Sequence, residues 1–177
     1  MRYLTVGATA LSIAFALATP AQAQKESDIL KVQQVIATMV EKDAGMQDWF
    51  DSSYGYVVFP NVGKGAIGVG GAHGNGLVYK GGELVAKSEL IQVTVGLQLG
   101  GQSFVEVIFF KDETAFKDFA RGNFEFAAQV SAVALTAGAS ADLAYNGGVA
   151  VVTMTNAGLM YEAAVGGQKF KYELIDG

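Results

Sequence analysis

The chain has 177 residues, 51% of them hydrophobic and 16% charged, which suits one globular domain once a targeting segment is removed. The pI near 4.8 and the formal net charge of −5 argue against nucleic acid as a partner and offer no general attraction to anionic membranes. The absence of cysteine excludes disulfides and thiolate ligands, and the 23 glycines favour a β-rich fold with many tight turns.

Residues 1–23 have the pattern of a cleaved export signal. Arg2 precedes an apolar run from Leu4 to Ala18, and Ala21-Gln22-Ala23 has the small-x-small form that signal peptidase cuts. The run is shorter than the roughly 20 apolar residues of a membrane-spanning helix. We therefore expect cleavage before Gln24 and export to the periplasm or to the periphery of the outer membrane.

An amphipathic helix is predicted from Ser27, as its cap, to about Ala44, with Gly45 ending it. Its apolar residues recur at three- and four-residue spacing. They are Ile29, Val32, Ile36, Met39 and Val40. Because basic and acidic residues balance on the polar face, we interpret the apolar stripe as core packing and not as a membrane-surface helix.

Met46, Trp49 and Phe50 follow at spacings that bring them together on one short helical turn. Aromatic residues near a chain start can anchor a protein at a membrane interface. A large aromatic pair beside a strand is more typical of a core, and core packing is the preferred interpretation.

The stretch from Tyr54 to Gly76 holds eight of the 23 glycines and the only histidine, His73. Strand-forming residues separate the glycines, so the stretch is predicted as two bent strands that approach other backbone closely. The glycines assigned to architecture are Gly65, Gly68, Gly70, Gly71 and Gly74.

The same stretch contains a formal G-x-G-x-x-G from Gly63 to Gly68. A dinucleotide site requires a helix to begin at these glycines, and more glycine and valine follow instead. Lys64 precedes Gly65 where a phosphate loop needs Ser or Thr, so that site is rejected too. One histidine without cysteine cannot form the usual zinc sites. We predict no metal, no cofactor and no enzymatic activity, with His73 hydrogen-bonded to backbone in a glycine turn.

Most of the remaining chain is predicted as strands joined by glycine turns. Clean alternation from Ile91 to Gly100 indicates a strand with the Ile91 side buried, and Phe104 to Phe110 is typical of a central strand covered on both faces. Within it, Glu106 either reaches solvent, the preferred interpretation, or is a functional buried acid. The other strands are Leu77 to Tyr79, Glu83 to Lys87, Val149 to Thr155, Leu159 to Val165 and Lys169 to Ile175.

Asp112 is predicted to cap a short helix from Glu113 to Arg121, with Phe116 and Phe119 facing inward. Residues 124–143 fit either strand or helix, because they are dominated by Ala, Ser and Gly. For residues 24–177 we expect one α+β domain. Its expected architecture is a strongly curved antiparallel sheet or partly closed barrel of about nine or ten short strands, with an N-terminal helix and one short inserted helix.

Four sequence segments together resemble the SYLF domain family. They are Gly55 to Pro60, Gly65 to Gly71, Gly74 to Gly76 and Val95 to Gln102, followed by the Phe-rich helix. The resemblance covers essentially the whole chain after the signal. It implies a lipid-binding domain: eukaryotic members bind phosphoinositide membranes, some fungal members bind actin, and bacterial members are exported. Actin is not expected as a partner of a bacterial member.

We therefore expect an exported, non-catalytic protein that binds phospholipid or a membrane surface. The candidate lipid-binding residues are Lys31, Lys42, Trp49, Phe50, Lys64 and His73. The alternatives are a structural or interaction protein of the envelope that docks a protein partner, a small outer-membrane barrel, and a hydrolase that uses His73.

Overall fold

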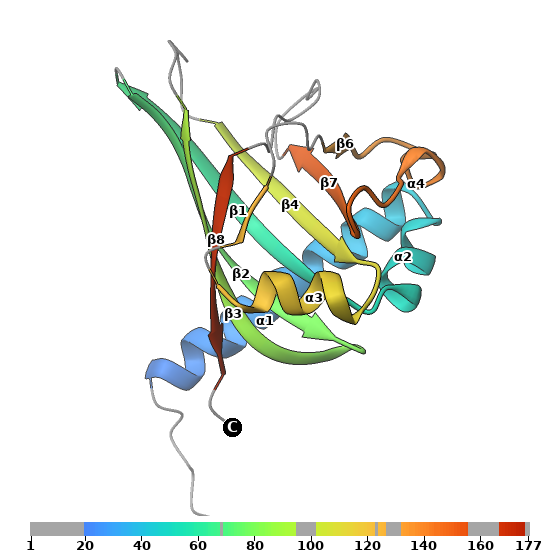
Figure 1. The fold of residues 1–177 in the computed structure, drawn as a ribbon, viewed down its shortest axis with the longest axis horizontal. Coiled ribbons are helices and arrows are strands. Elements are labelled where there is room, and N and C mark those ends of the chain that lie inside the picture. The colour runs from blue at the N-terminus through green and yellow to red at the C-terminus, as the bar shows by residue number, and fades with distance from the viewer. Residues whose placement is uncertain are drawn as a thin grey trace, which may run out of the picture.

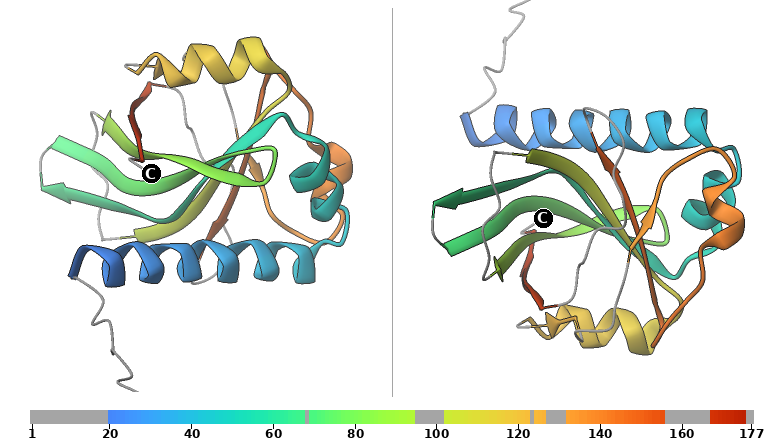
Figure 2. Two further views of the ribbon diagram at one scale, coloured as in Figure 1. Left: turned by 90° about the horizontal axis from the view of Figure 1, so that it is seen from below. Right: turned by 90° about the horizontal axis from the view of Figure 1, so that it is seen from above.

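The computed structural model describes residues 20–67, 69–94, 102–122, 124–126, 132–155 and 167–175. In these residues four helices and eight strands form three layers, with α1 on one face of the sheet, α3 on the other, and α2 and α4 at one end (Figures 1 and 2). The helices are α1 (Pro20–Lys42), α2 (Met46–Ser52), α3 (Glu113–Ala120) and α4 (Ala139–Asp142). None of the helices in this described part is long and apolar enough to cross a membrane.

The eight strands form one sheet in the order β5-β8-β3-β2-β1-β4-β7-β6. The strands are β1 (Gly55–Ile67), β2 (Val69–Lys80), β3 (Glu83–Thr94), β4 (Gln102–Phe110), β5 (Phe124–Glu125), β6 (Val133–Ala134), β7 (Val149–Thr155) and β8 (Gln168–Leu174). The β6–β7 pair is parallel and the other pairs are antiparallel. The edge strands β5 and β6 lie at opposite ends of the order, so the sheet is open.

The expectation of a strongly curved antiparallel sheet or partly closed barrel of about nine or ten strands is therefore wrong in the number of strands, in their direction and in closure. Polar residues 87–89 interrupt the apolar pattern, but the backbone ladder to β2 continues through them, so β3 is one strand where two were predicted. The described parts of residues 124–143, which are 124–126 and 132–143, contain two strands of two residues each, together with α4. The predicted strand Leu159 to Val165 lies outside the described residues.

The stretch from Tyr54 to Gly76 forms most of the β1–β2 hairpin, whose register shifts between Val58 and Val62. A Cβ at Gly76 would lie 2.6 Å from Cδ1 of Phe59 and 2.7 Å from the carbonyl oxygen of Val58. Glycine is therefore required where the Phe59 ring crosses the neighbouring strand.

Two apolar cores lie on the two faces of the sheet. One packs the sheet against α3 and contains Phe59, Phe110, Phe116, Phe119 and Phe170. The other packs the sheet against α1, α2 and α4 and contains Val32, Met39, Met46, Phe50 and Phe109. Strand β4 contributes to both cores, which confirms that it is a central strand.

Helix α1 buries Val32, Val35 and Met39, and the partly buried Ile29 and Ile36 pack beside them. Core packing of the apolar stripe is thus confirmed. The predicted start is wrong, because α1 begins at Pro20 and Ser27 lies within the helix.

The inserted helix follows its prediction closely. Asp112 accepts a hydrogen bond of 3.0 Å from the backbone N–H of Ala115, which caps α3, and the side chains of Phe116 and Phe119 are buried. Gly122 follows with φ of 70°, a left-handed conformation that favours glycine after a helix.

Several polar side chains are buried on the face of the sheet toward α3, and two of them, Glu106 and Gln92, contradict the expectation from the sequence. Glu106 is fully buried, so the interpretation that it reaches solvent is wrong. Gln92 is only 4% exposed while Ile91 is partly exposed, so the burial predicted for the two sides of this strand is reversed here. Both side chains point to the face that also buries Leu90 and Phe104.

Candidate functional site

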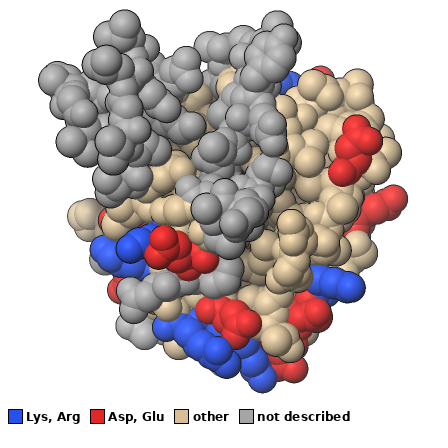
Figure 3. All heavy atoms as spheres, turned by 45° about the horizontal axis from the view of Figure 1, so that its top comes forward, with Lys and Arg blue, Asp and Glu red and all other residues tan. Residues whose placement is uncertain are grey.

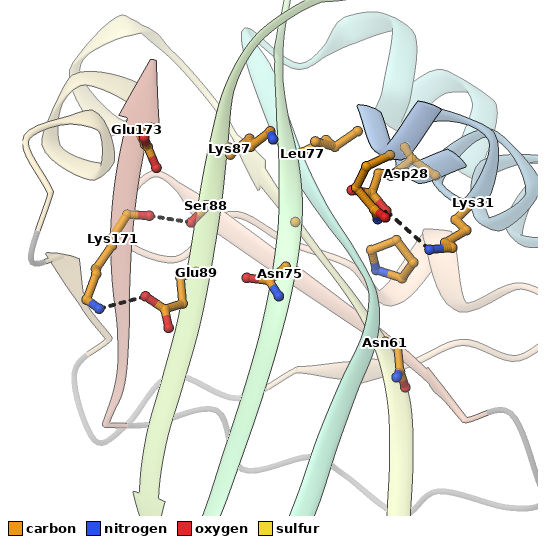
Figure 4. A pocket seen from close by; sticks show the side chains of 14 residues that line it. Asp28, Lys31, Asn61, Asn75, Leu77, Lys87, Ser88, Glu89, Lys171 and Glu173 are labelled. Carbon is orange, nitrogen blue, oxygen red and sulfur yellow. Dashed lines mark hydrogen bonds and ion pairs between the residues drawn. The ribbon is translucent and has the colours of Figure 1, made fainter. Parts of the chain in front are cut away.

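A groove of about 730 Å³ lies between the N-terminal half of α1 and the face of the sheet that α1 partly covers. Helix α1 packs on β1 and β2, and its side chains Asp28 and Lys31 line one wall (Figure 4). Strands β3 and β8 continue the sheet beyond α1 and supply the opposite wall. The volume is within the range of ligand pockets.

Strand alternation places polar side chains in this groove. Lys171 and Glu173 of β8 point away from the core that buries Phe170, and Glu89 of β3 points away from the core that buries Leu90. Pairing of β3 with β8 brings the two polar rows together, since Glu89 is opposite Lys171 in the register.

The carboxylate of Glu89 contacts two side chains, one on each of its oxygens. Lys171 Nζ lies 2.6 Å from its Oε2 and His73 Nε2 lies 3.0 Å from its Oε1. The hydrogen bond from Lys171, followed by that from His73, lowers the pKa of Glu89 below its ordinary value. Glu89 therefore stays ionised in the neutral range and carries a fixed negative charge.

The helical wall carries a similar cluster. Lys31 Nζ lies 3.2 Å from Oδ1 of Asp28, and the Nε2 group of Gln24 donates a hydrogen bond of 3.0 Å to the same oxygen. Asn75 of β2 and Asn61 of β1 add neutral amides to the groove lining.

Lys87 and Glu173 differ from the other charged residues of the groove. They are opposite each other in the β3–β8 register and both are exposed. Neither makes an ion pair or side-chain hydrogen bond with another residue in the described part of the chain. One positive and one negative charge are therefore available to a ligand.

The groove has no net formal charge, although the chain as a whole is acidic. Its charged residues are Lys31, Lys87, Lys171, Asp28, Glu89 and Glu173. The face of the molecule in Figure 3 likewise shows basic and acidic side chains close together, with no broad area of one sign among the described residues.

The structure brings together only part of the predicted lipid-binding set. Lys31 lines the groove, and His73 contacts it through Glu89. His73 lies within β2 and bonds to the side chain of Glu89, so the expectation of a backbone hydrogen bond in a glycine turn is wrong. Lys42 is the last residue of α1, about 16 Å along the helix from Lys31 at the usual helical rise. The side chain of Lys64 lies outside the described part of the structure.

Trp49 and Phe50 lie on α2, away from the groove lining. The ring of Trp49 packs 5.6 Å from that of Phe109, and its indole N–H donates a hydrogen bond of 3.2 Å to the carbonyl of Ser140. Phe50 is 9% exposed and belongs to the core under α1. Both side chains are thus engaged in packing.

Among the glycines assigned to architecture, a Cβ at Gly74 would lie 2.9 Å from Cγ2 of Val62, and one at Gly71 would lie 3.2 Å from the carbonyl oxygen of Gln92. Gly65 pairs with Gly71 across the hairpin. Gly70 of β2 pairs with Thr94 of β3, and Gly68 lies outside the described residues.

Sequence reasoning missed most of the groove. The one signal in the sequence is the alternation of residues 169–174, which places Lys171 and Glu173 on the same polar face of a strand. Lys87 and Glu89 join them only because β3 pairs with β8, which places them opposite residues more than 80 positions away in the sequence.

Within the described residues, no group of three or more His, Asp and Glu side chains could hold a metal ion. The groove offers amides, ammonium groups and carboxylates from rigid strands and a helix. This arrangement can bind a polar ligand through hydrogen bonds and ion pairs.

No protein-family model matches the chain. The chain is similar to Beta cell expansion factor A of Aeromonas veronii, with 28% identity over 123 residues. The match covers 68% of this chain and 46% of that protein, so the chain spans about half the length of this curated relative. The resemblance to SYLF domains stays a prediction beside this finding.

Proposed function

We propose that this protein binds phospholipid at a membrane surface without catalysis, and that the groove between α1, β3 and β8 receives the polar headgroup. The observation that carries the proposal is the convergence of Lys31, Lys87 and Lys171 from three separate elements on one cavity. Ammonium groups bind phosphate as point charges. The resemblance to SYLF domains, which implies lipid binding, supports the same function.

Two exposed apolar side chains adjoin charged groove residues. Leu30 of α1 precedes Lys31 and is 58% exposed, and Leu174 of β8 follows Glu173 and is 69% exposed. An isolated exposed leucine is ordinary on a protein surface. Strand alternation places Leu174 on the face of the sheet opposite to Glu173, and Leu30 lies about 160° around α1 from the buried Val32, so neither side chain lines the groove.

Co-sedimentation with liposomes at low salt tests the proposal. We expect the protein to sediment with vesicles, and the double variant Lys31→Ala/Lys87→Ala to sediment several-fold less. The matched control is Lys117→Ala on α3, an exposed lysine on the opposite side of the sheet, which should bind like the wild type. Absence of sedimentation with both zwitterionic and anionic vesicles would refute the proposal.

A second candidate function is the docking of an envelope protein. It is favoured by β8, where β5 pairs only with Phe170 and Lys169, so that residues 171–174 have a strand partner on one side only in the described structure. Such an edge can accept an extended segment of another protein. A stoichiometric partner in cross-linked envelope, together with negative liposome tests, would favour this function.

A further inference from the structure

We infer that the headgroup bound in the groove is phosphoethanolamine, a zwitterion with a phosphate and a primary ammonium. This inference rests on the proposed lipid-binding function and specifies its ligand. Three observations carry it: the charge balance of the groove, the position of Lys87 beside Glu173, and the composition of the lining.

The charge balance disfavours a ligand of one sign. A purely anionic headgroup near Lys87 would also approach Glu173, which makes no ion pair within the described residues and would repel it. A purely cationic ligand would be repelled by the lysines in the same way. A ligand that is itself neutral overall, with separated charges, satisfies both sets of side chains.

Lys87 and Glu173 provide the two contacts in the right arrangement. They are opposite each other on paired strands, and such neighbours have Cβ atoms about 5 Å apart. In phosphoethanolamine only two carbons separate the phosphate ester oxygen from the nitrogen. The phosphate therefore accepts from Lys87 Nζ while the ammonium donates to the carboxylate of Glu173.

The remaining groove charges are already paired within the walls. Glu89 is already an acceptor for Lys171 and His73, and Asp28 for Lys31, so these pairs are fixed features of the walls. Figure 4 shows Lys87 between the β8 side chains and the helical wall that carries Asp28 and Lys31. The phosphate is thus placed on the side nearer Lys31, and the ammonium on the side nearer β8.

The lining distinguishes ethanolamine from choline. Quaternary ammonium groups are recognised mainly by aromatic cages, and the described groove lining contains no aromatic side chain. A primary ammonium needs hydrogen-bond acceptors instead, and carboxylates supply them. The groove therefore selects a headgroup with N–H donors.

Vesicle binding with three compositions tests this choice. The vesicles are phosphatidylcholine alone, phosphatidylcholine with phosphatidylethanolamine, and phosphatidylcholine with phosphatidylglycerol. We expect the strongest binding to the vesicles with phosphatidylethanolamine. Equal or stronger binding to those with phosphatidylglycerol would overturn the headgroup assignment while leaving lipid binding intact, and binding to none would refute both.

The variant Glu173→Gln separates a zwitterion site from an anion site. Removing this carboxylate should weaken binding to phosphatidylethanolamine several-fold, as should Lys87→Ala. If the groove were an anion site, loss of the negative charge would strengthen binding, and that result would overturn the inference. Glu113→Gln on α3 is the matched control, since Glu113 is an exposed carboxylate on the other side of the sheet.

Soluble glycerophosphoethanolamine identifies the source of the headgroup. It should compete with vesicles containing phosphatidylethanolamine at high concentration, because it carries the same charges without acyl chains. Glycerophosphocholine should compete several-fold less well. Equal competition by the two compounds would contradict recognition of a primary ammonium.

Discussion

Gln168 of β8 donates a hydrogen bond of 2.9 Å to the carboxylate of Glu106 in β4, although β3, β2 and β1 lie between these strands. In a flat sheet, four steps between strands would separate them by about 19 Å. The sheet therefore bends around the core that it shares with α3. The ring contact of 5.8 Å between Phe59 of β1 and Phe170 of β8 lies on the same concave face.

Replacing Gln168 should lower the free energy of unfolding by removing its hydrogen bond to Glu106. Gln168→Leu leaves the fully buried Glu106 carboxylate without this donor, and loss of a buried hydrogen-bond partner costs about 1–3 kcal/mol, or more when the remaining group is charged. Urea unfolding measures the loss. The double variant Glu106→Leu/Gln168→Leu should lose less than the sum of the two single variants, and strict additivity would show that the pair is not coupled.

Gly76→Ala should destabilise the β1–β2 hairpin. The added methyl group would overlap the Phe59 ring and the Val58 carbonyl, and overpacking of this kind costs about 1–3 kcal/mol. Gly63→Ala in the same hairpin is the control, because no atom lies within 4 Å of a Cβ there. Thermal unfolding should show a lower Tm for the first variant only. Equal Tm values for both would mean that the sheet adjusts freely at Gly76.

Asp43 should make stability depend on pH in the acid range. It accepts a hydrogen bond of 2.6 Å from the N–H of Ser140, which joins the end of α1 to α4, and a local one of 3.1 Å from the N–H of Gly45. The bonds from Ser140, followed by that from Gly45, lower the pKa of Asp43 below its ordinary 3.8.

Because the folded pKa is the lower one, the contribution of Asp43 is present above about pH 3.8 and is lost as the pH falls through the folded value. Asp43→Asn should therefore be less stable than the wild type at pH 7, and the two should converge in strong acid. Urea midpoints measured across this range provide the comparison. A constant difference between the two proteins would rule out ionisation of Asp43 as the cause.

Tyr56 should make the stability of the fold depend on pH in the alkaline range. Burial, with smaller effects of Tyr79 and Asp51, raises its pKa from 10.0 to about 12. The stabilisation is complete below about pH 10 and is lost as the pH rises towards 12, since the unfolded chain releases the proton first. Tyr56→Phe should flatten the decline of stability with alkaline pH. If the variant loses stability with rising pH as steeply as the wild type, groups other than Tyr56 cause the decline.

Export can be tested by the mass of the protein recovered from the envelope. Cleavage before Gln24 would remove residues 1–23, including the first four residues of α1. We expect an intact mass for a chain that begins at Gln24, and Ala23→Lys should leave the precursor uncleaved. Recovery of an uncleaved wild-type chain from the cytoplasm would contradict the predicted signal.

Features that depend on residues close together in the chain were predictable from the sequence. The Asp112 cap, the inward Phe116 and Phe119, and the turn that gathers Met46, Trp49 and Phe50 all follow from spacing within one helical turn or one strand. Only the tertiary structure decided which strands pair. That pairing determines the number and order of strands, buries Glu106 and Gln92, and forms the groove. Alternation shows that Lys171 and Glu173 share a face, but not that Lys87 and Glu89 lie beside them. That neighbourhood arises because β8 pairs with β3, and pairing between residues more than 80 positions apart leaves no periodic signal in the sequence.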